Sequence, residues 1–171
     1  MTAAALPSDT RGRLTLEWFM PPPLGEGSPV VATGVFDVLH RAHIRFLSWT
    51  ASGGRPLYVG VEADDRVKAW KGPGRPVNPV AERAEIVAAL KAVAAVFIIA
   101  GDPDARTGPD YVELLTPIAP AAIAFSAGDP HRHAKLAAAD ALAADALEFP
   151  YQPGYSTTSI IDRLRAQQRS G

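Results

Sequence analysis

The stretch VVATGVFDVLHRAHIRFL, residues 30–47, holds the pattern that decides the fold. Its first four residues, Val30–Thr33, are apolar or β-branched, and such a short run predicts a buried strand. A glycine follows directly at Gly34, and the apolar spacing then predicts a helix over Ala42–Ala51. A strand that passes through a glycine loop into a helix is the repeating unit of α/β sheets.

The same alternation of strand and helix continues along the chain. Further strands are predicted at Leu57–Val61, Val96–Ala100, Ala121–Phe125 and Ala146–Phe149. Further helices are predicted at Val80–Val93, Asp110–Ile118, His133–Ala144 and Thr157–Gln168. The strands alternate little between apolar and polar residues, as expected when helices cover both faces of a sheet. We therefore predict one α/β domain, a doubly wound, Rossmann-like parallel sheet of about five strands with helices on both faces.

Residues 1–29 are expected to stand apart from this sheet. LTLEWFM, at 14–20, is apolar enough to be buried, and PPPLGEGSP, at 21–29, is a stiff and then flexible connector. We predict an N-terminal arm and linker over 1–29, without chemistry of its own, that packs on the domain or on a partner subunit. The domain is predicted over 30–171. Because the arm carries Trp18 and Phe19, we expect a homodimer.

The composition narrows the classes of protein to consider. The chain has 171 residues, which suits one domain with a sizeable core. Its net charge of -1 argues against a protein that binds nucleic acid along its surface. It contains no cysteine, which excludes disulfides, thiolate zinc sites and cysteine nucleophiles. The sequence shows neither a signal peptide nor a membrane span, so we expect a cytoplasmic protein without a membrane partner.

The loop after the first predicted strand has the composition of an anion site. Gly34 allows the backbone to approach a ligand closely, and the helix near Ala42 directs free N–H groups into the same space. His40 and His43, three residues apart, share one side of that first helical turn. A zinc site that also uses His131 and His133 is the alternative, because structural zinc needs three or four ligands.

Two later loops of the same predicted sheet edge have similar chemistry. KGPGRP, residues 71–76, places Lys71 and Arg75 around glycines, which suits a loop that covers a polyanion. GYSTT, residues 154–158, places hydroxyls at the start of the last helix, where they suit phosphate oxygens or simple N-capping. No GxxxxGK[ST] and no GxGxxG occur, so this chain would hold phosphates in another way.

The three loops together resemble a known superfamily. GVFDVLHRAH resembles the G-x-F-D-x-x-H-x-G-H signature of the cytidylyltransferase-like nucleotidyltransferases, and KGPGRPVNP and YSTTSII are similar to their lysine loop and S-T-T-x-I helix start. Order and spacing fit from Val30 to Leu164, so 30–171 looks like a nucleotidyltransferase domain. Within the superfamily, residues 60–83 are most similar to the adenylyltransferase domain of bacterial heptose-1-phosphate enzymes. Glycerol-3-phosphate and ethanolamine-phosphate cytidylyltransferases look more distant.

The resemblance implies a role for each matching residue. His40, His43 and Lys71 would be catalytic, holding the triphosphate and stabilising its charge during transfer. Residues expected to bind the nucleotide are Gly34, Val35, Phe36, Arg75, Gly128, Asp129, Gly154, Ser156, Thr157 and Thr158. Residues expected to bind the second substrate are Asp37, Asp64 and Arg83. No protein metal site is implied, and Mg²⁺ would arrive with the nucleoside triphosphate.

Three departures from the superfamily pattern leave the substrates open. Ala42 replaces the glycine between the histidines and adds a methyl group where the nucleotide approaches. PHRHAKL, after Asp129, does not align with the heptose enzymes. The segment before S-T-T lacks the arginine of the glycerol-phosphate enzymes.

The sequence thus predicts a nucleotidyltransferase. It would move a nucleoside monophosphate, AMP from ATP, to a phosphorylated small molecule such as a sugar 1-phosphate and release pyrophosphate. One alternative is a cytidylyltransferase acting on a phospho-alcohol or phosphonate. Another, motivated by Ala42, is a nucleotide-binding protein without catalysis. The third is a hydrolase with a metal bound by its histidines.

Overall fold

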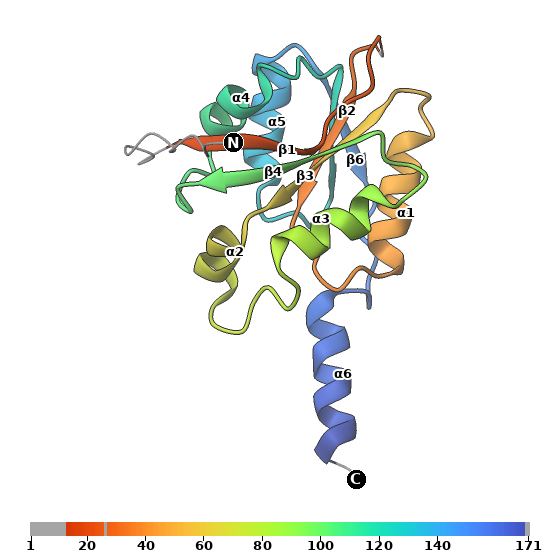
Figure 1. The fold of residues 1–171 in the computed structure, drawn as a ribbon, viewed down its shortest axis with the longest axis vertical. Helices are drawn as coiled ribbons and strands as arrows, with labels where there is room; N and C mark the ends of the chain where they lie inside the picture. The colour runs from red at the N-terminus through yellow and green to blue at the C-terminus, as the bar shows by residue number, and fades with distance from the viewer. Residues whose placement is uncertain (1–12, 26, 170–171) are drawn as a thin grey trace, which may run out of the picture.

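A six-stranded sheet with the order β1-β4-β3-β2-β5-β6 forms the centre of the computed structural model, which describes residues 13–25 and 27–169 (Figure 1). Its strands are β1 (Leu14–Met20), β2 (Val30–Gly34), β3 (Leu57–Glu62), β4 (Ala95–Gly101), β5 (Ala122–Ser126) and β6 (Asp145–Phe149). Strands β2 to β6 are parallel, and Val30 lies opposite both Leu57 and Ala122. The predicted α/β fold is confirmed, and the sheet has one strand more than we expected.

The additional strand comes from the segment that was expected to form an arm. LTLEWFM forms β1, which pairs antiparallel with β4 at the edge of the sheet. The ring of Trp18 packs edge-on against Tyr58 and Phe97, at centroid distances of 5.9 and 5.6 Å. The carbonyl of Arg13 accepts a hydrogen bond from the backbone N–H of Asp102 at 3.0 Å. This part of the expected arm therefore belongs to the domain, while residues 1–12 lie outside the described residues.

We expect Trp18→Ala to lower the free energy of unfolding by about 1–3 kcal/mol, because it removes two aromatic contacts and uncovers Phe97. Phe19→Ala is the matched control, because Phe19 is exposed to a similar degree, 41% against 37% for Trp18, but lacks the two ring contacts of Trp18. Urea unfolding of the two variants checks this. Equal losses for both would show that the edge strand contributes little beyond its backbone pairing.

Helices cover both faces of the sheet. Their bounds are α1 (Arg41–Ala51), α2 (Asp64–Lys71), α3 (Val80–Ala88), α4 (Gly108–Leu115), α5 (Arg132–Ala141) and α6 (Thr157–Arg169). Buried side chains of α1 and α3 pack on one face, and those of α4 and α5 pack on the other. Five of the helices lie close to their predicted positions. Among the described residues, no helix is long and apolar enough to cross a membrane.

Helix α2 is the element that the sequence pattern did not indicate. Only Arg66 and Val67 are buried in it, so it has almost no apolar periodicity. Charge stabilises it instead, with Asp64 and Asp65 in its first turn and lysines in its last, as the helix dipole favours. This helix carries Lys71 at its C-terminal end, so the lysine loop starts from a fixed element.

The carboxyl ends of the parallel strands meet at one edge of the sheet. The loops that follow β2, β3 and β5 lead there, and α6 begins near them before it extends away from the rest of the domain (Figure 1). Parallel α/β sheets bind ligands at this edge. The fold therefore brings the three predicted phosphate loops to one place.

Candidate active site

A cavity of about 520 Å³ opens at this edge of the sheet. Twelve of the sixteen residues predicted for the site line it: Gly34, Val35, Phe36, Asp37, His40, His43, Lys71, Gly128, Asp129, Ser156, Thr157 and Thr158. The four predicted residues outside the lining are Asp64, Arg75, Arg83 and Gly154. Ala42 also lines the cavity, so the methyl group that departs from the superfamily pattern lies on its wall.

The two histidines lie together at the start of α1. His40 is the N-cap residue, and its ring stacks on that of His43 with a centroid distance of 3.8 Å and an angle of 21°. The backbone N–H of His40 donates to Nδ1 of His43 at 3.4 Å. Because Nδ1 accepts this bond, a neutral His43 carries its proton on Nε2 and can donate it to a ligand.

Burial keeps this pair neutral. The pKa of His43 is lowered to about 3, first by burial and then by the nearby charges of His40 and Lys71, although Asp37 opposes this change. Burial also lowers the pKa of His40. The pKa of Lys71 is lowered by its partial removal from solvent and then by Arg75. At neutral pH the site therefore presents uncharged imidazole donors beside a lysine.

The low pKa of His43 predicts how stability depends on pH. The unfolded chain binds a proton near the ordinary histidine value of 6.5 while the folded chain does not, so stability present above that pH is lost as the pH falls toward 3. We expect the free energy of unfolding to fall by about 1–2 kcal/mol between pH 6.5 and about pH 5. His43→Gln should remove most of this loss in urea titrations. An unchanged pH dependence in that variant would contradict the assignment.

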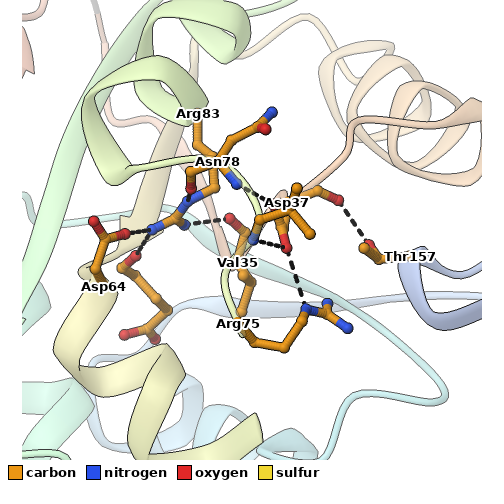
Figure 2. A network of polar contacts seen from close by, with 9 residues as sticks. Val35, Asp37, Asp64, Arg75, Asn78, Arg83 and Thr157 are labelled. Carbon is orange, nitrogen blue, oxygen red and sulfur yellow. Dashed lines mark hydrogen bonds and ion pairs between the residues drawn. The ribbon is translucent and has the colours of Figure 1, made fainter. Parts of the chain in front are cut away.

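Asp37 connects the three predicted phosphate loops. Its buried carboxylate accepts hydrogen bonds from the backbone N–H groups of Val77 and Asn78, at 2.9 and 3.1 Å. It also accepts one from Arg75 at 3.3 Å, and its carbonyl accepts one from the Thr157 hydroxyl at 2.6 Å. Figure 2 shows these contacts converging on Asp37 from the lysine loop and from α6.

Arg83 links two of these loops, the one after β2 and the lysine loop, to the end of β3. Its guanidinium is fully buried and donates to the carbonyls of Val35, Asn78 and Glu62, at 2.6, 2.9 and 2.8 Å (Figure 2). It also pairs with the carboxylate of Asp64 at 2.6 Å. These bonds join the loop after β2, the end of β3 and the start of α3 into one unit.

This network changes the interpretation of four predicted residues. Asp37, Asp64 and Arg83 were expected to bind the second substrate, but their polar atoms bond to the protein. Arg75 was expected to bind the nucleotide, and its side chain instead pairs with Asp37. We interpret all four as residues that position the loops.

The loop after β2 has an uncommon backbone. Phe36 and Val38 have φ values of 50° and 46°, in the left-handed region that side chains other than glycine rarely adopt. Strain of this kind persists only where surrounding contacts fix it. Here Phe36 is buried, and the bonds of Asp37 hold the residue between them. The loop is therefore fixed before a ligand arrives.

At the start of α6, Ser156 has both of the roles considered for it. Its hydroxyl accepts a hydrogen bond from the backbone N–H of Ser159 at 3.0 Å, so it caps the helix. Ser156 and Thr158 also line the cavity with exposed side chains, whereas Thr157 is buried against Asp37. Ser156 and Thr158 are thus the hydroxyl residues of this loop that a ligand can contact.

The cavity also contains residues that sequence reasoning missed. They come from the end of β3, from α2, from the loop before α4, from α4 and from α5, and they include Glu62, Trp70, Arg106, Tyr111 and Lys135. His131, which the sequence suggested only as a zinc ligand, lines the cavity just before α5. A lone lysine in the alanine-rich segment near 135 gave no signal, because only the fold brings it beneath β2. The described residues contain no group of three or more histidine and acidic side chains arranged to hold a metal ion.

Comparison with known proteins identifies the family. The cytidylyltransferase-like family model matches residues 31–163. The chain is 36% identical over 149 residues to the bifunctional protein HldE of Sodalis glossinidius, covering 84% of this chain and 29% of that protein. It is 33% identical over 138 residues to HldE of Bradyrhizobium sp., covering 80% and 26%. The chain thus spans less than a third of the length of these relatives.

A solved structure has the same fold. The lipopolysaccharide core biosynthesis protein of Thermoplasma volcanium superposes with a TM-score of 0.56 at 24% identity, covering 73% of this chain and 96% of that one. The family match and the relatives in turn place the chain in the cytidylyltransferase-like family of nucleotidyltransferases.

Proposed function

We propose that the protein transfers AMP from ATP to a phosphorylated small molecule, such as a sugar 1-phosphate, and releases pyrophosphate. The observation that carries this proposal is the convergence of His40, His43, Lys71 and the start of α6 on one cavity. These groups supply neutral donors, a cation and free N–H groups, which suit the oxygens of a triphosphate.

The chemistry follows from the nature of the acceptor. An oxygen of the acceptor phosphate attacks the α-phosphorus of the nucleotide, and the bond from that phosphorus to the bridging oxygen of the β-phosphate breaks. The electron pair leaves with pyrophosphate. A phosphate monoester is already ionised at neutral pH, so no general base is needed, and the rate depends on positioning and charge stabilisation. Mg²⁺ belongs to the nucleotide substrate and neutralises part of its charge.

Each group in the site has a role in this step. The Nε2–H of His43 donates to a phosphate oxygen, because Nδ1 already accepts a bond from His40. Lys71 adds a positive charge as charge shifts toward the leaving group. Asp37 holds the loops that carry these residues in fixed positions relative to one another.

We expect ATP to bind more tightly than CTP, because KGPGRPVNP is most similar to the adenylyltransferase branch of the superfamily. The aromatic side chains of Phe46, Phe149 and Tyr151 line the cavity and could stack on either base. Calorimetric titration with each nucleotide and Mg²⁺ measures the preference. Clearly tighter binding of CTP would favour the cytidylyltransferase alternative and leave the reaction class unchanged.

Pyrophosphate release tests the reaction itself. We would incubate the protein with ATP or CTP, using GTP and UTP as controls, and with phosphorylated sugars and alcohols. A nucleotide-binding protein without catalysis remains a second candidate, because the methyl group of Ala42 lies on the cavity wall. Tight binding of MgATP without pyrophosphate release from any pair would favour that candidate.

The homodimer expected from the sequence stays a prediction.

A further inference from the structure

The cavity continues beyond the loops assigned to the triphosphate. Its second half is lined by Trp70 from α2, Arg106 from the loop after β4, and Asp129, His131 and Lys135 around the start of α5. In the sheet, β3 and β4 lie on one side of β2, while β6, which precedes α6, lies on the other. Trp70 and Arg106 therefore lie across β2 from the loop that would hold the outer phosphates.

The loop that carries Arg106 is fixed by contacts to two side chains of α2. The indole N–H of Trp70 donates to the carbonyl of Pro103 at 2.8 Å, and Arg66 donates to the carbonyls of Asp102 and Ala105. Arg106 lies 5.9 Å from the ring of Trp70. A ligand would therefore meet a preformed wall.

His131 lines the cavity next to Trp70. Its ring lies 5.0 Å from that of Trp70, and its backbone N–H donates to the carboxylate of Asp129 at 2.7 Å. The other oxygen of Asp129 accepts from the buried amine of Lys135 at 2.6 Å, and this amine also donates to the carbonyl of Thr33 at 3.0 Å. The backbone of His131 is therefore held in place, and His131 lines the cavity.

The charges of this half favour an anion. Each carboxylate that lines it is already paired, Asp129 with Lys135 and Glu62 with Arg66, the latter at 2.7 Å. Among residues 13–25 and 27–169, Arg106 forms an ion pair only with Asp104, which is 89% exposed, and such surface pairs are weak. The described lining of this half therefore has a cationic excess and no unpaired carboxylate that could neutralise an ammonium group.

We propose that Trp70, Arg106 and His131 form the acceptor subsite, and that this subsite takes a phosphate monoester whose body is an uncharged polyol rather than an amino alcohol. The inference rests on the proposed nucleotidyl transfer. Arg106 and His131 donate to the acceptor phosphate, and Trp70 supplies an apolar surface for the carbon skeleton of the polyol. An ammonium group in the acceptor would be repelled by Arg106.

The first test compares acceptors at saturating ATP and Mg²⁺. Aldose 1-phosphates and glycerol 3-phosphate are acceptors whose organic part is uncharged. Phosphocholine and phosphoethanolamine are acceptors of similar size whose organic part carries an ammonium group. We expect pyrophosphate release with at least one uncharged acceptor and at least tenfold less kcat/KM with both ammonium acceptors. Equal or faster turnover with an ammonium acceptor would overturn the proposal, although nucleotidyl transfer itself would stand.

The second test uses variants with a matched control. Arg106→Ala and His131→Ala should each raise the acceptor KM by about 10–100-fold, the scale of a lost bond to a charged group, and leave the Kd of MgATP within about twofold. His133→Ala, two residues along and exposed, should change neither constant. An unchanged acceptor KM in both variants, or an equal loss of MgATP binding, would overturn the subsite.

A binding measurement separates this inference from the reaction. With α,β-methylene-ATP and Mg²⁺ filling the nucleotide loops, inorganic phosphate should shift the imidazole NMR signals of His131 and leave those of His133 in place. Arg106→Ala should weaken this response at least tenfold. If the wild-type protein binds phosphate at His131 but releases no pyrophosphate, the proposed function fails while the anion subsite stands. No shift at His131 would overturn the subsite.

Discussion

Replacing His40 or His43 with alanine is expected to lower turnover by about 10²–10³-fold, the usual loss when one preorganised donor to a developing negative charge is removed. The two rings stack at 3.8 Å, so each variant removes a donor and also the support of its neighbour. The Kd of MgATP should change less than kcat, because Lys71 and backbone N–H groups still hold the phosphates. Steady-state pyrophosphate release and calorimetry measure the two effects.

The double variant distinguishes joint action from independent action. Because both rings act on the same charge, the loss in the double variant should fall well short of the product of the single losses. His133→Ala controls for the loss of a histidine outside the cavity. A metal-binding pair would behave differently, since chelators would then reproduce the loss in the wild-type protein. Near-normal turnover in both single variants would contradict the proposed reaction.

Asp37→Ala is expected to lower turnover by about 10²-fold and the free energy of unfolding by about 2–4 kcal/mol. The variant leaves the N–H groups of Val77 and Asn78 and the side chain of Arg75 without their shared acceptor. A displacement of the lysine loop by about 1 Å is enough for a loss of this size. Asp37→Asn, which keeps one acceptor oxygen, should lose less of both. Pyrophosphate release and urea unfolding measure the two quantities.

A further experiment can separate an effect of Asp37 on the position of Lys71 from direct contact between Asp37 and the substrate. If Asp37 acts by holding Lys71 in place, the variant that lacks both side chains should be little slower than Lys71→Ala alone. Glu113→Ala is the control, because Glu113 also pairs with an arginine, Arg13, and neither residue lines the cavity. Losses that multiply in the double variant would show that Asp37 and Lys71 act independently.

The sequence was most informative where one local pattern has one structural outcome. Strands buried on both faces are continuous apolar runs, so β2 to β5 were found close to their observed positions. The three loops that meet at the cavity were predicted because glycine, histidine and hydroxyl residues follow strands or open helices. The strand β1 was missed although LTLEW alternates between apolar and polar residues, the pattern of a half-buried edge strand, because the prolines after it suggested an arm.

The roles of the charged residues could not be read in this way. Asp37 bonds to Val77 and Asn78, which lie about forty positions along the chain, and Arg83 bonds to the carbonyl of Val35. A carboxylate that holds a loop and one that holds a substrate look the same in a sequence. Only the burial of these side chains, and the partners that bury them, separates the two roles.

The hydrogen bond between Asp102 and the carbonyl of Arg13 determines where a recombinant version of this protein can begin. Gly101 has a φ of 103°, and a Cβ atom there would lie 2.1 Å from the same carbonyl oxygen, so the chain fits closely at this crossing. A version that starts at Thr15 would keep most of the strand but lose this bond. The loop that leads to Arg106 would then lose one contact at its start and keep those to Arg66 and Trp70. Purification tags should therefore be joined before Arg13, and the shorter version would serve as a probe of how stiff that loop must be.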